Sequence, residues 1–126
     1  MKAFVFWTGL LSGAAGIALQ LPALQARLFS NPLPGLVMPV FGLVAVFLGL
    51  MLVLCARDLR HRGVLVGWEG VLRVVGGAVI AGYGFLNGHG LLLVSGVGDL
   101  IIGAIYMVGL PRHLRVSTID LLLDRR

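Results

Sequence analysis

The chain has little charge and a single cysteine. With only Cys55, an intrachain disulfide is excluded, and no CxxC or Cys/His spacing indicates a metal site. Charged residues make up 12% of the 126 residues, against about 25% in soluble domains. Hydrophobic residues make up 59%, and the mean hydropathy is +1.03. The composition predicts a protein whose main solvent is lipid.

No motif predicts a cofactor, a metal or a catalytic group. No glycine-rich phosphate loop follows a strand, and no serine, histidine or cysteine arrangement suggests a nucleophile. The net charge of +5 suits anionic lipid head groups, since the sequence offers no soluble basic face for nucleic acid. We therefore expect no enzyme, no cofactor, no metal and no nucleic-acid partner.

Four apolar segments are each roughly the 20 residues that a transmembrane helix needs. We predict an all-α membrane protein, one domain over residues 1–126, with a four-transmembrane-helix bundle. We interpret the first segment as a retained helix rather than a cleaved signal peptide. Proline ends the fourth segment at Pro111. The predicted helices cover residues 3–19, 36–56, 64–86 and 91–110, with a short interfacial segment over 23–29.

Basic residues are distributed unequally between the two sides of this bundle. One side has Arg27, and the side with both termini has eight basic residues, several of them in a predicted basic loop over residues 57–62. The positive-inside rule then places both termini in the cytoplasm of a bacterial-type inner membrane. The eight residues are Lys2, Arg57, Arg60, Arg62, Arg112, Arg115, Arg125 and Arg126.

The two halves of the chain are similar when Trp7 is aligned with Trp68. WTGLLSGAAGIAL then matches WEGVLRVVGGAVI, which predicts two related helical hairpins in a parallel repeat. Thr8 and Ser12 occupy the positions of Glu69 and Arg73. The predicted site therefore belongs to the second hairpin.

Small residues are expected at the helix interfaces, because helices associate in lipid through close backbone approach. The predicted packing glycines are Gly9, Gly13, Gly16, Gly76, Gly77, Gly96 and Gly103.

Glu69, Arg73 and Asp99 are ionisable residues within the third and fourth segments, and such residues mark candidate sites. Glu69 and Arg73 are spaced i, i+4 and share a side of one helix. Counted from the turn at residues 87–90, Arg73 and Asp99 differ in depth by roughly 7 Å, and Glu69 lies near the level of Tyr106. We predict a buried cluster of these four residues.

Two interpretations of this cluster stay open. In the structural one, Arg73 neutralises both carboxylates and fixes the helix register. In the functional one, the excess negative charge makes one carboxyl, with Asp99 preferred, a proton carrier.

The tail over residues 117–126 resembles a short amphipathic helix. Ser117 and Asp120 have capping-box spacing, and Ile119, Leu122 and Leu123 share a face. It is expected to lie on the cytoplasmic membrane surface, with docking to a partner as the alternative.

Two functions fit these features, and an enzyme that acts on lipid or quinone substrates ranks third because no complete set of catalytic residues is visible. The first is a non-enzymatic accessory or assembly subunit that packs against other membrane helices or against itself. The alternative is a homo-oligomeric, proton-coupled small transporter or channel that uses Glu69, Arg73 and Asp99.

Overall fold

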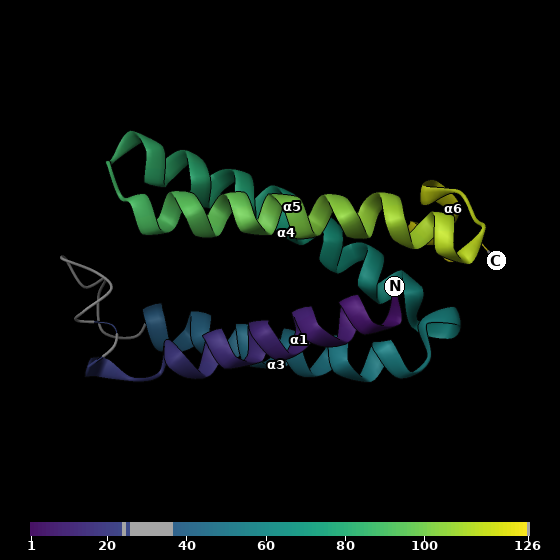
Figure 1. Cartoon of the computed structure of the whole chain (residues 1–126), viewed down its shortest axis with the longest axis horizontal. Helices are drawn as coiled ribbons and strands as arrows, with labels where there is room; N and C mark the ends of the chain where they lie inside the picture. The colour runs from purple at the N-terminus through teal and green to yellow at the C-terminus, as the bar shows by residue number, and fades with distance from the viewer. Residues whose placement is uncertain (24, 26–36, 126) are drawn as a thin grey trace. The chain divides into compact units, whose positions relative to one another are not determined.

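The computed structural model describes residues 1–23, 25 and 37–125, and every regular element among these residues is a helix. The predicted all-helical fold is therefore confirmed for the described part of the chain. The interfacial segment predicted over residues 23–29 lies outside the described residues, apart from positions 23 and 25. Figure 1 labels the helices α1 (Lys2–Ala18), α3 (Val37–Arg57), α4 (Leu59–Leu86), α5 (Gly90–Leu114) and α6 (Thr118–Leu122).

Three of these helices are long and apolar enough to cross a membrane, which supports a membrane protein. The candidate spans are Pro39–Arg57, Leu59–Leu86 and Gly90–Leu114. Helix α1 has 17 residues, so it measures about 26 Å, near the lower limit for a hydrocarbon core of about 30 Å. A bundle of four membrane helices stays a prediction.

The helices form two compact units, each built on an antiparallel pair. In the first unit, Lys2–Arg57, α1 packs along α3; in the second, from Asp58 onward, α4 packs along α5 and α6 contacts both. The pairs are visible in Figure 1.

Glycines bring α1 and α3 together at points seven residues apart. A Cβ on Gly9 would lie 2.9 Å from the Gly49 carbonyl oxygen, and one on Gly16 would lie 2.5 Å from that of Gly42. Gly13 supplies backbone to the same interface, because a Cβ on Gly49 would lie 2.6 Å from its nitrogen. The contacts at Gly9, Gly16, Gly42 and Gly49 are this short because these residues have no Cβ, whereas a Cβ on Gly13 would have no atom of the described structure within 4 Å.

The same spacing recurs between α4 and α5. A Cβ on Gly77 would lie 2.7 Å from the Gly96 carbonyl oxygen, and one on Gly103 would lie 2.8 Å from that of Gly70. Gly76 does not share this role, because a Cβ there would have no atom within 4 Å in the described structure. The glycine of α4 that contacts α5 is Gly77, the residue after Gly76.

The basic loop predicted over residues 57–62 is wrong. Helix α3 ends at Arg57 and α4 begins at Leu59, so Asp58 alone separates them. Asp58 is the N-cap of α4, and its carboxylate accepts a hydrogen bond from the backbone N–H of His61 at 3.4 Å. Aspartate is among the preferred N-cap residues because it satisfies such a donor, and the helix therefore restarts at once.

The predicted helix end at Pro111 is also wrong. Helix α5 continues to Leu114 and closes on Arg115 in the left-handed conformation, with φ of 58°. Proline has no N–H for the carbonyl four residues earlier, that of Met107. Thr118 donates its hydroxyl to this carbonyl over a long 3.5 Å. The tail thus partly compensates for the proline.

Helix α6 packs against α4 through a residue that the sequence pattern did not indicate. Ser117 caps the helix by accepting the N–H of Ile119 at 3.2 Å. Leu121 is 1% exposed, whereas Ile119 is 66% exposed. Leu122 of the predicted face also contacts α4, since its Cδ2 lies 3.2 Å from the place of a Cβ on Gly67, so the predicted face is docked only in part. Trp68 of α4 donates its indole N–H to the Leu122 carbonyl at 3.1 Å.

Candidate functional site

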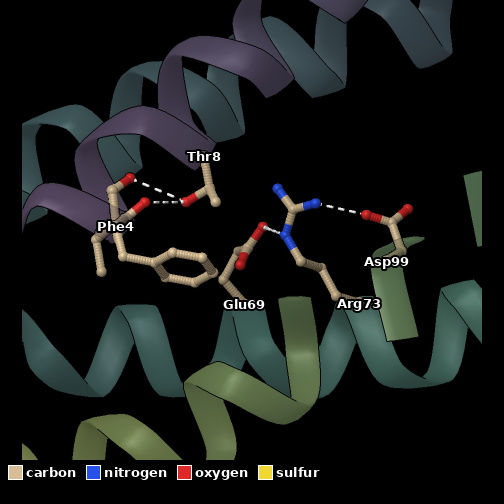
Figure 2. A network of polar contacts seen from close by, with 6 residues as sticks. Phe4, Thr8, Glu69, Arg73 and Asp99 are labelled. Atoms are coloured by element: carbon tan, nitrogen blue, oxygen red, sulfur yellow. Dashed lines mark hydrogen bonds and ion pairs between the residues drawn. The ribbon is translucent and has the colours of Figure 1, made fainter. Parts of the chain in front are cut away.

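Arg73 of α4 joins two carboxylates in the second unit. Its Nε donates to Glu69 Oε1 at 2.5 Å, one turn earlier on the same helix, and its Nη1 donates to Asp99 Oδ1 of α5 at 2.5 Å. Figure 2 shows the guanidinium between the two acids. The structure thus brings together three of the four residues of the predicted cluster in direct contact.

The glycine interface explains why Arg73 reaches Asp99. A Cβ on Gly77 would lie 3.1 Å from the Asp99 Cβ, so α4 and α5 almost touch at Asp99. Arg73 lies one turn before Gly77 on the same side of α4. Its long side chain therefore spans a gap that is already narrow.

The cluster is shielded from solvent on one side and more open on the other. The side chain of Glu69 is 2% exposed, that of Arg73 12%, and that of Asp99 32%. One cation faces two carboxylates, so the fully ionised cluster has one excess negative charge. Charge-assisted contacts of this kind are short and strong.

One carboxylate oxygen of Glu69, Oε2, accepts no hydrogen bond in the cluster. Its Oε2 is the one buried side-chain oxygen or nitrogen without a hydrogen-bond partner among the described residues. A buried unsatisfied carboxylate oxygen is costly.

Tyr106 lies beside the cluster. It is fully buried on α5, and its Cβ is 2.9 Å from the place that a Cβ on Gly70 would take. Gly70 follows Glu69 directly in α4. The tyrosine is thus at the depth that the sequence predicts, packed on the interface glycines.

The first unit has a neutral group at the aligned position. Thr8 donates to the carbonyl of Phe4 at 2.8 Å, and the Val5 carbonyl lies 3.1 Å from the same hydroxyl; Figure 2 includes this contact. Both of these carbonyls belong to α1, a helix that has no acidic residue.

Sequence reasoning missed a second acidic contact at the start of α4. Asp58 Oδ2 lies 2.9 Å from His61 Nδ1, and both side chains are exposed. The hydrogen bond with His61 lowers the pKa of Asp58. The spacing of three residues after an N-cap aspartate was the available signal.

The interface glycines Gly42, Gly49 and Gly70 were also missed. Their signal is the seven-residue spacing: Gly70 lies seven residues before the selected Gly77, and Gly42 and Gly49 repeat the spacing of the selected Gly9 and Gly16. Among the residues that the structure describes, no group of three or more His, Cys, Asp or Glu side chains could hold a metal ion.

Comparisons with protein-family models, with curated proteins and with solved structures find no match for this chain.

Proposed function

We propose that the chain is a non-enzymatic accessory or assembly subunit of a bacterial-type inner membrane, and that it packs against other membrane helices. The main support is the exposure of α5. Only 17% of its most apolar stretch is buried in the structure. In a membrane, the remaining surface contacts lipid or the helices of another subunit.

The charges support an orientation with both termini in the cytoplasm. In the second unit, Arg60 and Arg62 begin α4, and Arg112 and Arg115 lie at the end of α5. The opposite end of this antiparallel pair is the short turn at residues 87–89, which has no Lys or Arg. The positive-inside rule assigns the basic end to the cytoplasm.

The glycine contacts support an origin of the two units by duplication. Gly9 aligns with Gly70 and Gly16 with Gly77 when the tryptophans are matched, and all four take part in helix contacts. The partner glycines on the second helix of each pair are also seven residues apart. With α1 as a fourth span, the chain is a four-helix protein made of two hairpins.

The experiment that tests this proposal is native mass spectrometry of the protein released gently from its own membrane. A mass that includes a different polypeptide supports the subunit role and identifies the partner. A lone monomer after gentle release contradicts it. Cysteines placed at Gly88 and Ser117 in a Cys55→Ser protein test the orientation, because only the first is expected to react with an impermeant external reagent.

The unpaired oxygen of Glu69 favours a second candidate, a homo-oligomeric proton-coupled transporter or channel. Glu69 and Asp99 share one guanidinium, so one carboxyl can bind a proton without loss of charge balance. This candidate predicts a defined homo-oligomer and proton flux into liposomes that Asp99→Asn abolishes. Unchanged flux in a folded Asp99→Asn protein would exclude Asp99 as the carrier.

A further inference from the structure

A shallow hollow lies at one end of the first unit, where α1 begins and α3 ends. It has a volume of about 230 Å³, smaller than the roughly 300–1,000 Å³ of pockets for small molecules. Both helices contribute to it because they are antiparallel. The hollow is lined by Lys2, Ala3, Phe6, Trp7, Ala56 and Arg57.

The lining combines two cations with an apolar, partly aromatic floor. Lys2 and Arg57 carry positive charge, and the lining has no acidic residue. Phe6 and Trp7 stack edge to face with their ring centres 5.8 Å apart, and Trp7 is 66% exposed. The surface of the hollow is almost entirely apolar, and two of the side chains that line it carry positive charge.

The position of these residues indicates the kind of anion. Arg57 is the last residue of a candidate membrane span, so the hollow lies where the hydrocarbon core meets the head groups. Tryptophan prefers this level of the membrane, and Lys and Arg here attract anionic lipids. A phospholipid has both required parts, a phosphate for the cations and an acyl chain for the aromatic surface.

We infer that this hollow, the Lys2–Arg57 hollow, binds the head group of an anionic phospholipid whose acyl chain lies against Trp7. Lys2 and Arg57 contact the phosphate. The site rests on the proposed membrane location, and it adds a specific lipid to the partners of the chain.

Quenching of Trp7 fluorescence by brominated lipid tests this inference. The chain has two tryptophans, so Trp68→Phe leaves Trp7 as the reporter. Vesicles contain one quarter phosphatidylglycerol and three quarters phosphatidylcholine, with bromine on the acyl chains of one lipid at a time. We expect brominated phosphatidylglycerol to account for about twofold or more of the quenching that its share predicts.

Matched variants distinguish a specific lipid site from the general attraction of anionic lipids to basic residues. Lys2→Gln/Arg57→Gln is expected to reduce the enrichment to the bulk share, whereas Lys2→Arg/Arg57→Lys keeps it. Arg112→Gln/Arg125→Gln removes the same charge from the second unit and is expected to leave it unchanged. Far-UV circular dichroism checks that each variant is helical.

The remaining outcomes each decide a different point. Quenching in proportion to lipid share overturns the lipid site and leaves the membrane location intact. Equal loss in both glutamine variants overturns it as well, because the attraction is then not local. Absence of quenching by either lipid removes α1 from the membrane, and the proposed four-helix membrane protein fails with it.

Discussion

Adding one methyl group at Gly77 is expected to separate α4 from α5, whereas adding it at Gly76 is not. A Cβ on Gly77 would lie 2.7 Å from the Gly96 carbonyl oxygen and 2.9 Å from the Leu100 nitrogen. Both are backbone atoms, which cannot turn away as a side chain can. Ordinary contact begins at 3.4 Å, so the helices must move apart by about 0.7 Å, the difference between 3.4 and 2.7.

The expected magnitude follows from two opposing effects. Alanine favours the helix over glycine by about 1 kcal/mol, and this gain is common to both positions. Overpacking at Gly77 costs about 1–3 kcal/mol, whereas Gly76 has open space. Gly77→Ala should therefore be less stable than Gly76→Ala by about 1–3 kcal/mol.

Unfolding in mixed micelles by increasing fractions of sodium dodecyl sulfate, followed by far-UV circular dichroism, measures this difference. The two variants differ by one position in the same helix, so detergent effects cancel. Equal midpoints for Gly76→Ala and Gly77→Ala would refute the close backbone contact between α4 and α5.

Three further predictions concern the polar contacts. Arg73→Gln should destabilise the second unit by about 3–5 kcal/mol, since it leaves buried Glu69 unpaired, and Glu69→Gln/Arg73→Gln should recover much of this loss in the same unfolding assay. An NMR titration should place the pKa of Asp58 below its ordinary value of 3.8. The stability that Asp58 adds is present above about pH 4 and is lost as the pH falls through the lowered pKa. Asp58→Asn should remove this pH dependence. Leu121→Ala should release the tail and speed trypsin cleavage after Arg115, because the loss of this buried leucine side chain costs about 2–5 kcal/mol. Ile119→Ala changes an exposed position and should leave the cleavage rate unchanged. Equal cleavage rates in the two variants would contradict the docking of α6.

The part of the structure predictable from sequence is the part fixed within one helix or one short turn. Apolar length predicts the helices, and i, i+4 spacing predicts that Glu69 and Arg73 share a side of α4. The short turn then sets the depth of Asp99 relative to Arg73, because few alignments of the two helices are compatible with it.

The predictions that failed concern contacts between residues that are far apart in the sequence. Pro111 lies inside α5, and Thr118 of the tail contacts, at 3.5 Å, the carbonyl that the proline leaves without a donor. Leu121 is buried because it reaches Gly67 of α4, which helical periodicity within the tail cannot reveal. The choice between Gly76 and Gly77 is a rotation of about 100°, and only the position of α5 decides it.

The seven-residue spacing of the interface glycines has a consequence for how each hairpin finds its alignment. Sliding α5 along α4 by seven residues, about 10.5 Å, would again set a glycine against a glycine, but the three-residue turn between the two helices does not allow it. Such a slide would pull Asp99 away from Arg73. In the first unit, the hydrogen bond from Gln20 Nε2 to the Pro39 carbonyl, at 2.8 Å, is specific to one alignment in the same way. Among the described residues, each hairpin thus has a polar contact that fits the observed alignment and would be lost in a shifted one.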